Sequence, residues 1–414
     1  MTQGSEAGRR RSEWQVGWRA VAACMAGTSA GLQLFTYLTS LFVKPLAAAF
    51  GWSRGQIAAA SGALLVCALL MPLAGFIADR RGVRALAAAG VAAFFVSYVA
   101  LASMTGAIWQ YFAILALIAF VGGPCTNYFL FARPIVAAFH RSRGFALSLS
   151  LCGVPLVSFV LLPLLQHIIL AHGWRAAYQT LALISLLLGA AAILLLRRAS
   201  SASQPDADRT EAATSGASFG EVVCDARFWL LMLAAAGVCL TTGFYVSSLQ
   251  PMLSDKGVQP ARAALLGSWY AAAAIAGRLA VGGLLDRLSP ILVGALALGA
   301  PAVALLIFFF ATGGHALPFV VGVGLFAVAN GAEADVVCFL AARYFGLRAN
   351  GRVNGLLGSM SAIAIAVGGM MSGVVFDRLG SYDAVLLGGA AASLVAALAL
   401  VATNWTVRPI MATA

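Results

Sequence analysis

The chain has 414 residues, of which 62% are hydrophobic and 10% are charged, well below the roughly 25% charged residues of a soluble domain. Apolar runs of about 20 residues, the length that crosses a bilayer core about 30 Å thick, recur along the whole chain. The runs are continuous rather than alternating, which predicts membrane-spanning helices and excludes a β-barrel.

Taken in chain order, the apolar runs predict twelve transmembrane helices. The expected spans are residues 17–45, 55–78, 85–105, 108–138, 145–170, 174–196, 228–254, 262–285, 290–312, 316–342, 353–376 and 382–404. The stretch between the sixth and seventh spans is rich in Ser, Ala, Thr, Asp and Arg and cannot cross a membrane. We therefore expect an all-α membrane protein with a six-helix bundle at 1–198, a cytoplasmic linker at 199–226 and a second six-helix bundle at 227–414.

The two halves repeat each other at an offset of about 207 residues. The matching positions are Gly75, Asp79 and Arg80 with Gly282, Asp286 and Arg287; Gly173 with Gly380; and Tyr37 with Tyr245. Parallel internal repeats in a membrane protein are typical of one kind of secondary transporter. The offset also shows where the two halves differ.

The net charge of +12 could indicate a nucleic-acid partner, but the predicted topology explains it better. An even number of spans places both termini on one side, and 19 of the 26 Lys and Arg residues then fall on that side, six on the other and one, Arg278, within a helix. Positively charged loops favour the cytoplasm. We expect a multi-pass protein of the plasma (inner) membrane with both termini cytoplasmic.

Three ionisable residues, Arg278, Glu333 and Asp335, lie deep within predicted helices of the second half. Arg278 is about 12 Å, and Glu333 about 15 Å, from the nearest cytoplasmic turn along its helix. The repeat pairs Arg278 with Met71 and Glu333 with Asn127, so the first half lacks both of these charges. An ionisable residue at such depth costs at least about 2.5–3.5 kcal/mol and should face a partner or a wet cavity.

Arg278 is the candidate anchor for a substrate carboxylate, because guanidinium stays charged and binds carboxylates bidentately. The alternative is a permanent salt bridge with Glu333. Glu333 itself is a candidate for proton coupling or gating. Asp335 lies about 200° further round the same helix, so it has either a structural partner or the coupling role. Asn330 shares the face of Glu333 and is a candidate substrate contact.

Polar side chains also follow one face of several predicted helices. Gln33 and Tyr37 lie on such a face in the first span, and Tyr245 repeats the pattern in the seventh. Asn127 and Tyr128 lie in the fourth span. We expect these five residues to contact substrate, although polar groups on helix faces also serve as contacts between helices.

The turn at Gly75-Phe-Ile-Ala-Asp79-Arg80-Arg81-Gly82 resembles the loop between the second and third helices of the major facilitator superfamily, and its core returns in the second half. The resemblance covers nearly the whole chain and implies two six-helix halves that rock about a central cavity. In that setting Asp79, Arg80, Asp286 and Arg287 are candidate gate residues, and Arg133 is a fifth.

Four patches are similar to the monocarboxylate porter and oxalate–formate antiporter branch of that superfamily. They are 42–46, 50–54, 139–146 and Gly277-Arg278. In that branch an Arg at the last position holds the substrate carboxylate. The chain departs from the branch at Ala274, where animal porters carry an Asp, and in its eleventh helix, which lacks the second cation of the oxalate–formate exchangers. An acid with one carboxylate is therefore favoured over a dicarboxylate.

These features predict a secondary transporter of a small organic anion, with proton symport favoured over exchange. The sequence has no phosphate-binding loop of the G-x-x-x-x-G-K-[ST] type, no clustered catalytic residues and no metal-ligand cluster. We expect no enzyme activity, no cofactor, no nucleic-acid partner and a monomer in the lipid bilayer. The alternatives are an anion exchanger or an exporter of larger aromatic or amphipathic compounds.

Overall fold

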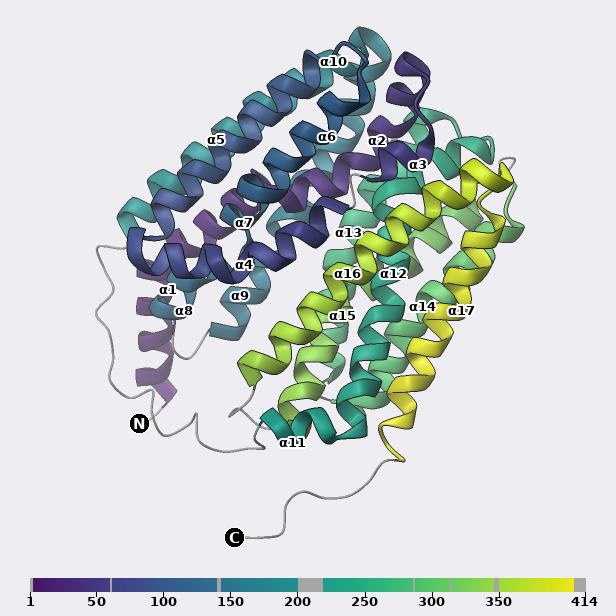
Figure 1. Ribbon diagram of the computed structural model, residues 1–414. Helices are drawn as coiled ribbons and strands as arrows, with labels where there is room; N and C mark the ends of the chain where they lie inside the picture. The colour runs from purple at the N-terminus through teal and green to yellow at the C-terminus, as the bar shows by residue number, and fades with distance from the viewer. Residues whose placement is uncertain are drawn as a thin grey trace. The chain divides into compact units, whose positions relative to one another are not determined.

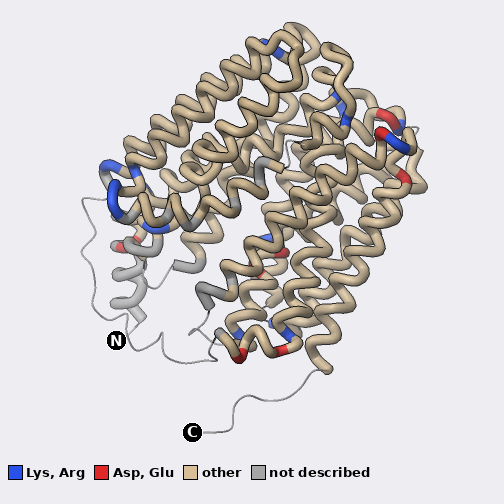
Figure 2. The backbone as a smooth tube through the Cα atoms, viewed as in Figure 1, with Lys and Arg blue, Asp and Glu red and all other residues tan. Residues whose placement is uncertain are grey.

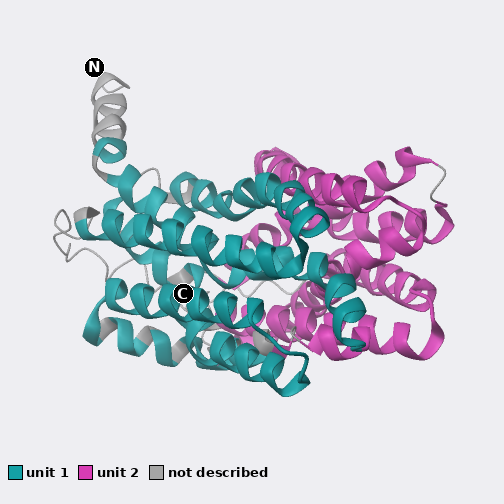
Figure 3. Ribbon diagram, turned by 90° about the horizontal axis from the view of Figure 1, so that it is seen from above, with its two compact units in different colours: residues 1–52, 63–205 teal, residues 53–62, 206–414 magenta. Residues whose placement is uncertain are grey.

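The computed structural model describes residues 3–59, 62–139, 143–199, 219–285, 287–312, 315–345 and 350–405, with some side chains within these ranges left undescribed. Every regular element in them is helical (Figure 1). The chain forms two compact units, residues 1–52 with 63–205 and residues 53–62 with 206–414 (Figure 3). It belongs to the expected class, an all-α membrane protein with twelve spans in two parallel halves.

Unit 1 contains the helices of the first half. They are α1 (Gln3–Ser29), α2 (Leu32–Phe50), α4 (Gly62–Arg81, which begins at the end of the other unit's segment), α5 (Val83–Ala102), α6 (Ile108–Leu117), the π-helical turn η2 (Ile118–Gly122), α7 (Gly123–Cys125), α8 (Tyr128–Ala138), α9 (Arg143–Leu151) and α10 (Gly153–Ala199). The long helix α10 packs on α1, α2 and α5. Its two arms are separated at Gly173, whose φ of 83° turns the chain, so α10 supplies both the fifth and the sixth span.

Unit 2 contains the second half and one short helix from the first. The helices are α3 (Arg54–Ala58), α11 (Phe219–Cys224), α12 (Ala226–Asp255), α13 (Pro260–Leu285), α14 (Pro290–Phe310), α15 (Ala316–Phe345), α16 (Asn350–Leu379) and α17 (Asp383–Ala402). Helix α12 packs on α16 and α17, α13 on α15, and α14 on α15 and α17. Gly380 has a φ of 69° at the turn before α17, as its repeat partner Gly173 has a positive φ in α10.

Ten helical stretches of the described chain are long and apolar enough to cross a membrane. One of them, 145–197, holds two spans joined at Gly173, and α4 occupies the expected second span. Lys, Arg, Asp and Glu gather near the helix ends, and the long middle stretches are almost free of charge (Figure 2). The low content of charged residues therefore agrees with helices whose long middle stretches are apolar.

Two spans of unit 1 that the sequence predicts as continuous are broken. The first span is interrupted between Ser29 and Leu32, and the fourth at Thr126, between α7 and α8. The breaks meet, because the hydroxyl of Thr126 packs against Gly31 and accepts a hydrogen bond from the backbone N–H of Leu32 at 3.2 Å. Irregular backbone at bilayer depth needs such partners inside the protein, since lipid supplies none.

Candidate functional site

The site begins with close packing of α13 against α15 in unit 2. A Cβ on Gly277 would lie 2.6 Å from the Cα of Val328, and a Cβ on Gly331 would collide with the carbonyl oxygen of Ala274. Only glycine at both positions allows the two backbones to approach this closely. Arg278 follows Gly277 directly, so the close packing of α13 on α15 places the Arg278 side chain against α15.

Arg278 is held at one edge of its guanidinium. Its Nε–H donates to the carbonyl oxygen of Gly331 at 2.9 Å, and the same nitrogen lies 3.5 Å from a carboxylate oxygen of Asp335. Its Nη1 is buried and has no hydrogen-bond partner among the residues that the structure describes. Because a buried N–H group without a partner costs about 1–3 kcal/mol, this edge is suited to an incoming anion.

Glu333 faces a different pair of helices. It accepts a hydrogen bond from the hydroxyl of Ser361 in α16 at 3.3 Å and also bonds with the thiol of Cys239 in α12. The permanent Arg278–Glu333 salt bridge considered from the sequence is therefore replaced by an Arg278–Asp335 pair. The reason is the helical rotation between positions 333 and 335, which points their side chains to opposite sides of α15.

Asn330 and Tyr245 belong to an aromatic group beside this site. The amide of Asn330 donates to the hydroxyl of Tyr270, and the ring of Tyr270 stacks on Tyr245 with a centroid distance of 3.7 Å. Phe326 lies against the pair, 6.1 Å from Tyr245. Tyr245 is only 4% exposed. Its ring therefore contributes to packing among α12, α13 and α15 in this conformation.

In unit 1 the structure brings Met71 and Asn127 into contact. The repeat pairs these residues with Arg278 and Glu333 of the charged site. The amide of Asn127 lies 3.3 Å from the sulfur of Met71 and donates to it. These positions correspond to Glu333 and Arg278 in the other half. The segments that carry these positions thus contact each other in both units, but in unit 2 the contact joins Arg278 to Asp335 rather than to Glu333.

The remaining candidates of unit 1 lie close to the broken helices. Tyr128 is half-buried and its hydroxyl donates to the carbonyl of Leu147 at 3.4 Å. Gln33 and Tyr37 are half-buried on α2, within two turns of the break at Gly31. Gln33, Tyr37, Asn127 and Tyr128 therefore all lie within two turns of the breaks, whose own residues are buried.

The candidate gate residues lie at helix ends or on exposed faces. Arg80 lies in the last turn of α4, with its guanidinium 4.3 Å from the ring centroid of Phe76. Arg287 and Arg133 are exposed. The side chain of Asp79 and the whole of Asp286 lie outside the described residues.

Sequence reasoning missed Cys239, Ser361 and the carbonyl of Gly331. These residues become partners of Glu333 and Arg278 only through helix packing. A signal for the last one existed, because Gly277 and Gly331 are the small residues that close helix contacts require. No comparable signal in the sequence marks Cys239 or Ser361.

Comparisons with known proteins place this geometry in context. The family model described as Major Facilitator Superfamily matches residues 21–369. A search of curated proteins found no match. Solved structures that share the fold include the following three. The first is the nucleoside transporter NupG, with TM-score 0.70, 15% identity and coverage of 94% of this chain and 99% of that one.

The second is a bacterial homologue of the human lysosomal transporter Spinster in an inward-facing, unoccupied conformation, with TM-score 0.69, 18% identity and coverage of 94% and 95%. The third is a bacterial homologue of the human drug peptide transporters PepT1 and PepT2, with TM-score 0.69, 14% identity and coverage of 94% and 98%. At these identities the likeness is one of fold.

Proposed function

The chain belongs to the Major Facilitator Superfamily, and on that basis we propose that it is a secondary transporter of a small organic anion, with a monocarboxylate as the best-fitting substrate. Transport by alternating access follows from the family. The choice of substrate comes from the residues of the site. Nucleosides and peptides appear in the names of proteins that share only the fold, so those names do not decide the substrate of this chain.

The observation that carries the proposal is the state of the Arg278 guanidinium. One edge is fixed by Gly331 and Asp335, and Nη1 has no partner within the described part of the chain. A carboxylate is the small group that matches a guanidinium edge in charge and spacing. A single cation at this depth suits a substrate with a single carboxylate.

Asp335 is the group that we propose to couple transport to protons. Its carboxylate already lies beside Arg278, so an arriving substrate carboxylate and Asp335 compete for one cation. A proton on Asp335 removes this competition. Substrate and proton would therefore bind together, which is symport, and Glu333 would act in gating through α12 and α16.

The positive charge of the loops on the side of the termini supports an orientation with both termini in the cytoplasm, and we propose the plasma (inner) membrane as the location. We further propose that one chain, without a cofactor, forms the transport unit. An exchange mechanism is the alternative to symport. It predicts uptake that depends on internal substrate rather than on a pH gradient.

A thermal-shift screen on purified protein tests the substrate class. Small monocarboxylates should raise the melting temperature of the wild type and leave Arg278→Ala unchanged. Arg278→Lys keeps the charge but cannot bind a carboxylate bidentately, so its affinity for the monocarboxylate should fall by about tenfold to a hundredfold. Arg262→Ala, an exposed position on the same helix, is the matched control and should respond as the wild type does.

Two results would overturn the assignment. Equal stabilisation of wild type and Arg278→Ala by carboxylates would remove Arg278 from the site. Stabilisation by large aromatic or amphipathic compounds, independent of Arg278, would favour the exporter alternative.

A further inference from the structure

Unit 1 contains a groove of about 220 Å³ that the proposed transport site does not use. One wall is the face of α4 around Ile77, the other is the start of α5, and η2 and α7 form the floor. Among the described residues that line the groove, Arg81 is the only one with a charged side chain. Because Arg81 is the last residue of α4, the groove is apolar along its length and cationic at one end.

The shape of the groove follows from small residues on one wall and a displaced floor. Ala85 and Ala89 lie one turn apart on α5, and their methyl groups leave room that longer side chains would occupy. The floor belongs to the interrupted fourth span, where the π-helical turn Ile118–Gly122 leads into Pro124 and the break at Thr126. A π-turn and a proline both displace a helix from a straight path. The backbone of unit 1 therefore builds the groove.

The repeat shows that the second half carries other residues at these positions. The offset of 207 pairs Ala85 with Leu292, Ala89 with Leu296 and Arg81 with Leu288. Larger apolar side chains thus replace the two methyl groups, and an apolar side chain replaces the guanidinium. The two halves share one fold, so the fold alone requires neither the small residues nor the cation in unit 1.

The groove suits an apolar occupant. Water needs about two to four polar partners, and the side chains of the groove offer only the guanidinium of Arg81 and the thiol of Cys125. Leu73 and Phe120 in its lining are 53% and 61% exposed, so the groove opens outward. Helix α5 is long and apolar enough to cross a membrane. A hydrocarbon chain of the surrounding lipid is therefore the apolar group available to fill it.

The length of the groove matches one leaflet of a bilayer. Leu70 and Arg81, at its two ends on α4, are 11 positions apart in the sequence. At 1.5 Å per residue this separation is about 16 Å, and half of a hydrocarbon core about 30 Å thick is about 15 Å. A lipid chain that fills the groove would therefore have its headgroup at the level of Arg81.

The charge at this end of the groove selects the headgroup. Arg81 is exposed, and no hydrogen bond or ion pair joins it to a described side chain. Arg80 and Arg84 flank it at the turn from α4 into α5, where Figure 2 shows a concentration of positive charge. Guanidinium groups bind phosphate oxygens bidentately. Three neighbouring cations favour a headgroup with a net negative charge over a zwitterionic one.

We propose that this groove binds one anionic phospholipid from the leaflet on the side of the chain termini. One acyl chain lies between α4 and α5 on the floor formed by η2 and α7, and the headgroup phosphate binds Arg81. The chain then packs on Pro124, two residues before the break at Thr126, so the bound lipid supports the interrupted fourth span. The proposal requires a bilayer but no particular substrate or coupling ion.

Lipid binding to the full-length chain in detergent tests the proposal. Native mass spectrometry counts the bound lipids during titration with phosphatidylglycerol or with phosphatidylcholine of the same acyl chains. One phosphatidylglycerol should bind about fivefold more tightly than phosphatidylcholine and should raise the melting temperature. Inorganic phosphate alone should leave the melting temperature unchanged, because it lacks the chain that fills the groove.

Two variants transfer residues of the second half into the groove. Ala89→Leu fills the site of the chain as Leu296 does, and the affinity for phosphatidylglycerol should fall about tenfold because less of the chain is buried. Arg81→Leu removes the phosphate contact as Leu288 does. Its affinity for phosphatidylglycerol should fall about fivefold, and the preference over phosphatidylcholine should be reduced.

Two exposed positions supply the matched controls. Ala88→Leu adds the same side chain to α5 outside the groove lining, and Arg343→Leu removes an exposed cation of unit 2. Both should bind phosphatidylglycerol as the wild type does. A thermal melt without added lipid establishes that each variant is folded. If Ala89→Leu does not fold, Ala85→Leu tests the same wall of the groove.

Three results would overturn the proposal. The first is equal affinity for phosphatidylglycerol in Ala88→Leu and in the folded variant that fills the groove. The second is equal binding of the two lipids by the wild type, or stabilisation by inorganic phosphate alone. The third is a lipid-free dimer that Ala89→Leu dissociates, which would assign the groove to a second copy of the chain. None of these measurements involves a substrate carboxylate, so they are independent of the test of Arg278.

Discussion

Replacing Asp335 with Asn tests the ion pair on which the proposed coupling depends. The Asp335 carboxylate lies 3.5 Å from the Nε of Arg278, and the two side chains are 30% and 15% exposed. At an effective dielectric constant of about 20, opposite charges at that distance attract by about 4–5 kcal/mol. Partial exposure and desolvation remove much of this energy, which leaves about 1–2 kcal/mol, a factor of about 5–30 in an equilibrium constant.

Two changes should follow in Asp335→Asn. The dissociation constant of an anionic substrate should fall by about 5–30-fold, because Asn no longer competes for Arg278. Accumulation driven by a pH gradient should be lost, because Asn cannot carry the proton. Exchange of labelled for unlabelled substrate should persist. Proteoliposomes measure both activities on one preparation, as counterflow at equal pH and as uptake under an imposed gradient.

Glu333→Gln is the parallel variant, because its carboxylate bonds to Ser361 and Cys239 rather than pairing with Arg278. It should retain gradient-driven accumulation. The reasoning is refuted if Asp335→Asn accumulates substrate as the wild type does, or if its binding becomes weaker. Loss of accumulation in Glu333→Gln alone would transfer the coupling role to Glu333.

Two further predictions concern the helix contacts that hold the site. Gly368→Ala should destabilise the protein by about 1–3 kcal/mol, because its Cβ would collide with the carbonyl oxygen of Leu240. Gly358→Ala, where no atom lies within 4 Å, should be nearly neutral. Thermal unfolding followed by size-exclusion chromatography measures both variants. Thr126→Val should cost about 1–3 kcal/mol, since it leaves the buried N–H of Leu32 without its acceptor. Thr126→Ser keeps the hydroxyl and should restore most of the loss. Equal melting temperatures for the two variants would contradict this reasoning.

The broken helices show where local patterns stop being informative. The segments 17–45 and 108–138 are mostly apolar, and this pattern predicts a continuous helix in each case. The breaks at Gly31 and Thr126 arise because each supplies what the other needs: the small residue makes room for the hydroxyl, and the hydroxyl replaces a lost backbone partner. The hydrogen bond that joins them links residues 94 positions apart, and such a pairing leaves no periodic signal in the sequence.

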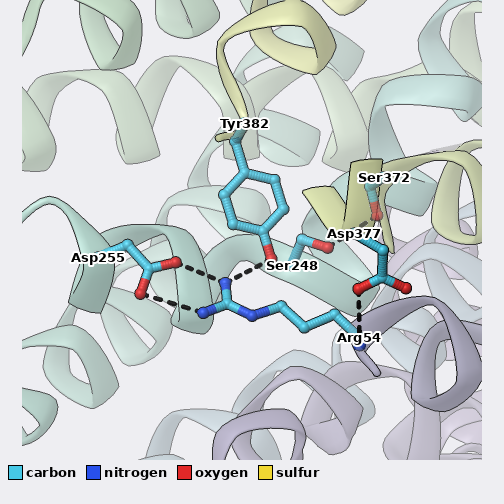
Figure 4. Close-up of polar contacts among 6 residues, drawn as sticks. All are labelled: Arg54, Ser248, Asp255, Ser372, Asp377 and Tyr382. Carbon is cyan, nitrogen blue, oxygen red and sulfur yellow. Dashed lines mark hydrogen bonds and ion pairs between the residues drawn. The ribbon is translucent and has the colours of Figure 1, made fainter. Parts of the chain in front are cut away.

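Residues 53–62 illustrate the same limit for domain boundaries. Most of these ten residues fall in the expected second span, 55–78, so composition predicts that they belong with the first half. Their assignment to unit 2 depends on contacts of Arg54 with Asp255, Asp377 and Tyr382, which are more than 200 positions away in the chain (Figure 4).

The sequence by itself determined the membrane-spanning class, the two six-helix halves and the presence of Arg278, Glu333 and Asp335 within long apolar helices of the second half. These follow from hydrophobic length and from the repeat, which are properties read along the chain. The tertiary structure decided which carboxylate meets Arg278. Positions 333 and 335 face opposite sides of α15, and the face turned toward α13 is set by the approach of Gly277 and Gly331, a contact between distant segments.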